Sequence, residues 1–152
     1  MKIRNATITD IDQINTLWLE SAKYHQKFDK EMYSNISKKD IQEHSESIIK
    51  SIKDPTRSII VITQESNVIG YILGIIIKRK KEKTGILADM MITKKFQRKG
   101  LGSILIKNIL NFFKKKNCTK STLNVFENNI IAINAYTKFG FKKHICTMQK
   151  KL

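Results

Sequence analysis

Two glycines and two cations, placed between an apolar segment and an amphipathic one, form the stretch with the clearest chemistry. In Gln97–Gly102, the residues Gly100 and Gly102 let the backbone come close to a ligand. Backbone amides at the start of a helix favour anions, and Arg98 and Lys99 add positive charge. The stretch is therefore predicted to bind phosphate.

The spacing of the glycines excludes two common phosphate-binding loops. A dinucleotide fingerprint would need a third glycine where Leu105 stands. A P-loop would need Lys and then Ser or Thr after its last glycine, where Ser103 and Ile104 stand. What remains is a Q-x-x-G-x-G pattern between a predicted strand and a predicted helix.

This pattern resembles the pyrophosphate loop of the GNAT acetyl-coenzyme A-dependent N-acetyltransferases. A second segment, Asn129–Phe141, fits the family pattern N-x-x-A-x-x-x-Y-x-x-x-G-F without a gap. The resemblance is strong from Leu87 to Phe141 and weaker over residues 1–55. It implies a single domain, 1–152, of mixed α/β (α+β) fold, with a mostly antiparallel twisted sheet of about six to seven strands flanked by about four helices.

The resemblance also implies how acetyl-coenzyme A would bind as cosubstrate. The loop amides would hold its pyrophosphate, and the strand before the loop would offer backbone groups to the pantetheine and thioester. Asn129 would lie beside the pantetheine arm, although an asparagine at a helix start is also a common cap. The implied coenzyme-binding residues are Met90, Met91, Ile92, Gln97, Arg98, Lys99, Gly100, Leu101, Gly102, Ser103 and Asn129.

Two residues are expected to be catalytic. Tyr136 matches the family tyrosine and is predicted to act as general acid, because a phenol with a pKa of about 10 is protonated at neutral pH. Asp89 is the best candidate for a general base, although a strand-end carboxylate paired with Lys or Arg is the alternative. Glu20 and His25 are further candidates for the base.

The acceptor is expected to be a primary amine, attacked directly in a ternary complex. Deprotonating a lysine-like amine at pH 7 costs about 4 to 5 kcal/mol, whereas an N-terminal amine costs about 1 kcal/mol, so only the former needs a strong base. Family members acting on ribosomal-protein N-termini often carry a Glu near the place of Asn124, which weakens that assignment. Polyamines, aminoglycoside-like amines and protein lysines are the alternative acceptors that the sequence leaves open.

The charge is uneven along the chain, whose net charge is +16. Residues 1–55 hold nine basic and nine acidic residues, so the whole surplus lies in residues 56–152. A basic half could bind nucleic acid, steer an anionic coenzyme or simply be solvated lysine. A nucleic-acid-binding module and a non-catalytic acyl-coenzyme A-binding regulatory domain are the alternative functions. Nucleic acid is disfavoured because no recognised reader motif accompanies the charge.

Other sequence features indicate where in the cell the protein is expected to be and whether a metal site is expected. The start of the chain lacks an apolar signal segment, and the longest apolar run, Val68–Ile77, is too short to span a bilayer. A soluble cytoplasmic protein without membrane contact is expected. Cys118 and Cys146 are isolated from ligand-like spacings, so no metal site is predicted. The resemblance is compatible with a homodimer, since family members often pair.

Periodicity predicts the elements that must position these residues. Thr9 and Asp12 have the spacing of a helix start. Predicted helices are Ile11–Phe28, Lys39–Lys53, Leu101–Lys115 and Asn129–Phe139, and predicted strands are Lys2–Ala6, Ser58–Thr63, Val68–Lys78, Thr84–Ile92, Ser121–Phe126 and Phe141–Lys150. Residues 29–37 show no clear period.

Overall fold

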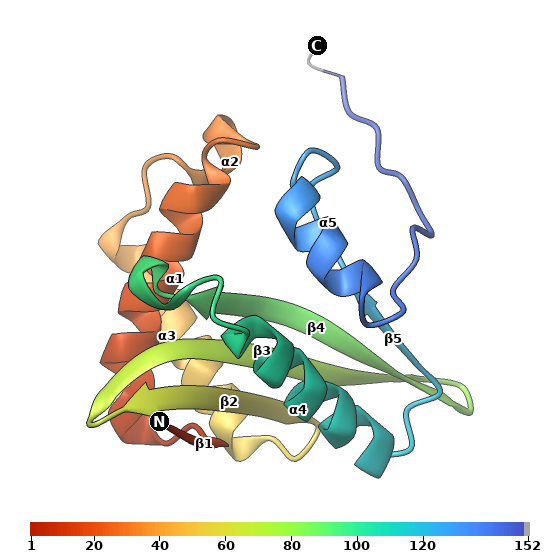
Figure 1. The fold of residues 1–152 in the computed structure, drawn as a ribbon. Helices are drawn as coiled ribbons and strands as arrows, with labels where there is room; N and C mark the ends of the chain where they lie inside the picture. The colour runs from red at the N-terminus through yellow and green to blue at the C-terminus, as the bar shows by residue number, and fades with distance from the viewer. Residues whose placement is uncertain (151–152) are drawn as a thin grey trace.

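A twisted five-stranded sheet with helices on both faces forms the described part of the chain, residues 1–150, in the computed structural model (Figure 1). Its strands lie in chain order: β1 (Lys2–Asn5), β2 (Arg57–Gln64), β3 (Asn67–Arg79), β4 (Glu82–Ile92) and β5 (Lys120–Leu123). Neighbouring strands are antiparallel except β4 and β5, which are parallel. A parallel pair needs a crossover, and the chain makes it through a helix.

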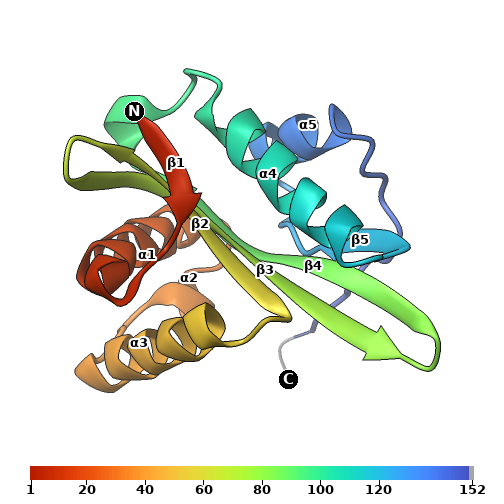
Figure 2. The same cartoon turned by 90° about the horizontal axis from the view of Figure 1, so that it is seen from below.

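The helices divide between the two faces of the sheet (Figure 2). One face carries α1 (Ile11–His25) and α3 (Lys38–Lys53), and the other carries α4 (Leu101–Lys115), with α5 (Ile130–Thr137) packed against the same core as α4. The short helix α2 (Lys30–Tyr33) lies between α1 and α3 in the chain. Two single turns, η1 (Ile8–Asp10) and η2 (Lys94–Phe96), precede α1 and α4.

Each face of the sheet has its own apolar core. Because side chains alternate along a strand, β2 and β3 supply both cores, which explains their near-continuous apolar sequences. On the α4 face, β3 must lack a side chain where the helix comes closest. A Cβ at Gly74 would lie 2.6 Å from Ile109 Cδ1 and 2.8 Å from Phe113 Cζ, so glycine permits this packing.

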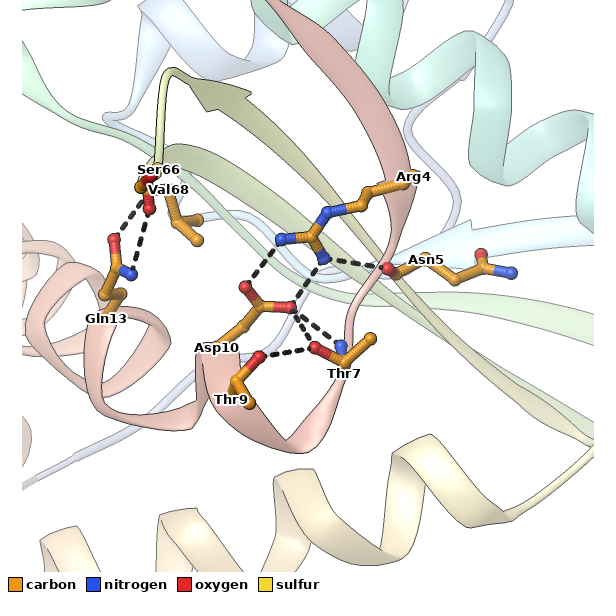
Figure 3. Close-up of polar contacts among 8 residues, drawn as sticks. All are labelled: Arg4, Asn5, Thr7, Thr9, Asp10, Gln13, Ser66 and Val68. Carbon is orange, nitrogen blue, oxygen red and sulfur yellow. Dashed lines mark hydrogen bonds and ion pairs between the residues drawn. The ribbon is translucent and has the colours of Figure 1, made fainter.

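A buried ion pair fixes the first strand to the start of α1 (Figure 3). Arg4 of β1 donates two hydrogen bonds, of 2.7 and 2.8 Å, to the carboxylate of Asp10, which is 3% exposed. The Thr7 amide donates a third, of 2.7 Å. One turn further on, Gln13 accepts from the Val68 amide at 2.7 Å, which joins α1 to the β2–β3 turn.

The mixed α/β fold predicted from the sequence is confirmed, with differences in the number and the bounds of its elements. The described residues form five strands rather than six or seven, and five α-helices rather than four. The additional helix is α2, a single turn capped by Asp29 and too short to show a period. The helix-start pair is Thr7 and Asp10 rather than Thr9 and Asp12, and the fifth strand ends at Leu123 rather than Phe126.

The predicted last strand, Phe141–Lys150, is wrong: the structure assigns no strand to these residues. Ile145 and Met148 are 84% and 91% exposed. Because they stand three residues apart, a strand would point them to opposite faces, so pairing would not give this segment one apolar face to bury.

The Arg4–Asp10 pair generates a prediction about acid stability. The hydrogen bond from Arg4 is the main cause that lowers the pKa of Asp10 from 3.8 to about 2. A lowered folded-state pKa contributes stability that is fully present above about pH 4 and is lost as the pH falls through about 2. We expect Asp10→Asn to lower the free energy of unfolding at pH 7 by about 2 kcal/mol, measured by urea denaturation.

The difference between wild type and Asp10→Asn should shrink to a small fraction of its pH 7 value at pH 2, because about half of the folded-state carboxyl and nearly all of the unfolded-state carboxyl are then protonated. Glu127→Gln, which removes an exposed carboxyl from a loop, serves as the control and should unfold as wild type does. A difference that stays constant from pH 7 to pH 2 would contradict the role given to the charge.

Candidate active site

The predicted phosphate-binding loop leads directly into α4. Gly100 caps the helix in the left-handed conformation, with φ of 80°, and the helical ladder begins with the bond from the Ile104 amide to the Gly100 carbonyl. The amides of the first turn therefore have no carbonyl partner inside the helix. Gln97 anchors the loop, because its side-chain amide donates to the Ile92 carbonyl at the end of β4 at 2.8 Å.

The surroundings of Gly102 leave room for a ligand. A Cβ added there would meet only the side chain of Ile92, at 3.6 Å, so the fold itself does not demand glycine at this position. A Cβ at Gly100 would meet nothing within 4 Å, but its positive φ disfavours other residues. Open amides beside an unobstructed glycine fit the pyrophosphate of a coenzyme.

Just before this loop, one edge of β4 has no neighbouring strand. The parallel pairing of β4 with β5 ends at Leu87 and Leu123, so β4 residues 88–92 have no paired strand on that side. Met90 and Ile92 pack against the α4-face core, and Met91 packs against the opposite core. The three residues expected to offer their backbone to the coenzyme thus lie on the open edge.

A bulge in β4 sets the direction of Asp89. The consecutive β3 residues Leu73 and Gly74 pair with Asp89 and Leu87, which leaves Ala88 as an extra residue on β4. Strict alternation would place Leu87 and Asp89 on the same face. The extra residue breaks this alternation, as bulges do, and turns the carboxylate away from the α4-face core that Leu87 joins.

The carboxylate of Asp89 is held by a phenol of the neighbouring strand. Tyr71, which is fully buried in the core on the α1 and α3 face, donates a short hydrogen bond to Asp89 Oδ2. Burial raises the pKa of Asp89, while the bonds from Tyr71 and the Met90 amide oppose that rise. Among residues 1–150, no Lys or Arg forms an ion pair with Asp89, unlike the alternative considered from the sequence.

Tyr136 approaches the same carboxylate from α5. Its side chain packs against the α4-face core and meets the Phe141 ring edge-on, with centroids 5.9 Å apart. Burial, and then the charge of Asp89, raises the pKa of Tyr136 to about 12. The structure therefore brings the predicted acid and the predicted base within electrostatic reach of each other.

Asn129 is buried, and its side chain has two partners. Its Oδ1 accepts from the Ala132 amide at 3.3 Å, which caps α5, and from the Tyr24 hydroxyl at 3.4 Å. The capping role considered from the sequence is thus present in the structure. The contact with Tyr24 ties the start of α5 to the end of α1.

The two weaker base candidates lie in other surroundings. Glu20 lines a hollow of about 420 Å³ together with Thr93 and Phe96. His25 lies among aromatic rings, where burial lowers the pKa of its imidazole. No contact between either side chain and Asp89 or Tyr136 is observed in the part of the chain that the structure describes.

Tyr71 and Tyr33 are the site residues that sequence reasoning missed. Tyr71 stands inside the apolar stretch that forms β3, where it is indistinguishable from a core residue until the strand register is known. Tyr33 lies in α2, and burial and then the charge of Asp89 raise its pKa. One signal for Tyr71 was in the sequence: its hydroxyl is the lone polar side-chain group between Val68 and Ile77.

Two features, a membrane-spanning helix and a metal-binding group, are absent from residues 1–150. None of the helices within residues 1–150 is long and apolar enough to cross a membrane. The same residues contain no group of three or more His, Cys, Asp or Glu side chains placed to hold a metal ion.

Comparison with solved structures shows what the fold resembles. The fold is similar to that of solved acetyltransferases: the Trypanosoma brucei acetyltransferase has a TM-score of 0.71 at 17% identity, covering 99% of both chains. Arabidopsis thaliana glucosamine-6-phosphate N-acetyltransferase has a TM-score of 0.69 at 20% identity, covering 99% of this chain and 97% of its own. A mutant of the Bacillus halodurans protein BH1408 has a TM-score of 0.88 at 18% identity, and the match covers 100% of this chain and 99% of the BH1408 chain.

The family follows from the sequence match. Residues 15–141 match the family model described as acetyltransferase (GNAT) family, and the chain belongs to this family. No curated protein sequence matches it significantly. The predicted resemblance is confirmed.

The space around Gly102 generates a prediction about coenzyme binding. We expect Gly102→Ala to fold normally, because its Cβ meets only Ile92 at 3.6 Å, and to bind acetyl-coenzyme A at least about tenfold more weakly, because the methyl group obstructs the amides. Titration calorimetry gives the affinity and thermal melting checks the fold. Asn111→Ala, on the exposed side of α4, is the control. Wild-type affinity in Gly102→Ala would refute the assignment of the loop.

Proposed function

We propose that this protein is an N-acetyltransferase that moves the acetyl group from acetyl-coenzyme A to a primary amine by direct attack in a ternary complex. One observation carries the proposal: Tyr71 holds the carboxylate of Asp89 on the stretch of β4 whose edge is open and which leads into the free amides of α4, and the charge of Asp89 acts on the phenol of Tyr136. Amine acetylation needs a base and an acid at one place, and this arrangement supplies both.

The loop and the strand before it would bind the cosubstrate. Acetyl-coenzyme A supplies the acetyl group as an activated thioester. The first-turn amides of α4, with Arg98 and Lys99 beside them, would hold its pyrophosphate. The unpaired residues 88–92 of β4 would hydrogen-bond its pantetheine arm through the backbone.

The bound ammonium would first give one proton to Asp89, which frees the nitrogen lone pair to attack the thioester carbonyl and form the new carbon–nitrogen bond. The second proton that the nitrogen must lose would pass to the Tyr136 phenolate after that phenol has protonated the leaving thiolate. Burial raises the pKa of the Asp89 carboxyl and makes it a stronger base than an exposed aspartate. Tyr71 keeps the carboxylate oriented, and its hydrogen bond opposes that rise in the pKa of Asp89. A buried carboxylate without a basic partner also attracts an ammonium group.

Tyr136 would donate a proton to the thiolate sulfur as the carbon–sulfur bond breaks. While Asp89 is charged, the pKa of Tyr136 is held at about 12. Transfer of the amine proton neutralises Asp89 and removes one of the two causes of that rise. The phenol therefore becomes a better donor once the base has acted.

Tyr136→Phe tests the acid. We expect kcat to fall about 100-fold or more, because general acid catalysis contributes on that scale, while the affinity for acetyl-coenzyme A changes little. The measurement is thiol release together with calorimetry. Asn111→Ala, on the exposed side of α4, is again the control for both measurements. Unchanged kcat in Tyr136→Phe would remove Tyr136 from the acid role.

Asp89 and Tyr71 are tested together through the pH profile. Because Asp89 acts as base only when ionised, kcat/KM should rise with pH through its pKa. Tyr71→Phe deletes a hydrogen bond to the charged form, so its acidic limb should move to higher pH. Asp89→Asn should lose the limb and about 100-fold in kcat/KM. An unshifted limb in Tyr71→Phe, or a retained limb in Asp89→Asn, would contradict the base assignment.

A further inference from the structure

Five aromatic rings from three separate segments meet beside the proposed catalytic pair. We call them the aromatic cluster: Tyr24 and His25 of α1, Phe28 after it, Tyr33 of α2 and Phe126 between β5 and α5. His25 is central, with centroid distances of 5.2 Å to Tyr33, 5.7 Å to Tyr24 and 5.9 Å to Phe126. Phe28 stacks on Phe126 at 5.6 Å. All five side chains are only partly buried.

The aromatic cluster adjoins the site on two sides. Tyr33 feels the charge of Asp89, and Tyr24 donates a hydrogen bond to Asn129 at the start of α5, the helix that carries Tyr136. Phe126 is fixed in the same turn, because the Asn129 amide donates to the Phe126 carbonyl at 2.9 Å. The rings therefore adjoin the start of α5, the helix that carries the proposed acid.

The chemistry of the aromatic cluster suits an ammonium group on an apolar body. Ring faces attract cations, and the Lys27 ammonium already lies 3.7 Å from the centre of the Tyr24 ring. Asp89 adds one carboxylate. Burial lowers the pKa of His25, which disfavours its cationic form and makes it a poor partner for an anionic acceptor.

A sugar phosphate fits these surroundings less well. It needs cations beside its phosphate, and Lys27 is the one basic residue with a ring contact to the aromatic cluster within residues 1–150.

We infer that the aromatic cluster is the acceptor subsite and that it takes a primary monoamine carried on an aromatic body, with the ammonium at Asp89 and the body against Phe28, Tyr33 and Phe126. This inference rests on the proposed acetyl transfer and names its substrate class. A ring contact contributes through the apolar area that it buries and through the aromatic pairing itself, so the loss of one is expected to weaken affinity roughly tenfold.

The experiment compares 2-phenylethylamine, ethylamine, spermidine and glucosamine 6-phosphate as acceptors, read as thiol release. The inference predicts the highest kcat/KM for 2-phenylethylamine. Phe126→Ala should raise KM for 2-phenylethylamine about tenfold and should change kcat/KM for ethylamine, which has no ring, by a clearly smaller factor. Val125→Ala, which alters the preceding exposed side chain, is the matched control.

A second readout does not require turnover. Calorimetry of 2-phenylethylamine with the coenzyme A-bound protein should give binding that Phe126→Ala weakens about tenfold, while thermal melting confirms that the variant is folded. Acetyl transfer with a preference for spermidine or glucosamine 6-phosphate would overturn the subsite and leave the proposed function standing. Absence of coenzyme binding and of transfer to any amine would instead overturn the proposed function. Calorimetry of 2-phenylethylamine with the protein alone would then decide the subsite, and no binding would overturn it as well.

Discussion

The interaction on which this site depends is the hydrogen bond from Tyr71 to the buried carboxylate of Asp89. A carboxylate shielded from water is costly to ionise unless its charge is satisfied, and Asp89 has no ion-pair partner among the described residues. The bond exists because the extra residue Ala88 breaks the alternation of β4 and turns Asp89 towards the face on which Tyr71 is packed. The stable interior of β3 thereby holds a group that would otherwise destabilise the fold, and a carboxylate of raised pKa is available for chemistry.

The same stretch of β4 separates the two halves of the proposed reaction. Its edge opens where the pairing with β5 ends, and the loop that follows it leads into the free amides of α4. Asp89 points to the face that carries α1, whose end joins the aromatic cluster, while Tyr136 comes from α5 on the face that carries α4. The donor thioester would therefore meet the amine at β4, with base and acid on different sides of it. Distant parts of the structure maintain this geometry: Gly74 lets α4 lie close to the sheet, and the Arg4–Asp10 pair holds the start of α1.

The sequence predicted the parts of this arrangement that local chemistry determines. Glycine spacing identified the loop, periodicity identified α1, α3 and α4, and the segment around Tyr136 identified the family that residues 15–141 match. It could not predict Tyr71, because the partner of Asp89 depends on strand register and on a bulge that no single-strand pattern reveals. It also missed α2, which a capping side chain stabilises rather than a periodic apolar face. The last strand was wrong for a related reason: short apolar runs indicate extended chain but do not ensure a partner.

The most direct test of direct transfer at one site is an initial-rate experiment in which acetyl-coenzyme A and 2-phenylethylamine or another accepted amine are varied together. The structure predicts that thiol release requires both substrates and that the double-reciprocal lines intersect, as expected when the amine attacks within a ternary complex. Intact-protein mass after incubation with acetyl-coenzyme A alone should stay unchanged. Parallel lines with an acetylated protein, or thiol release that no amine stimulates, would contradict the account.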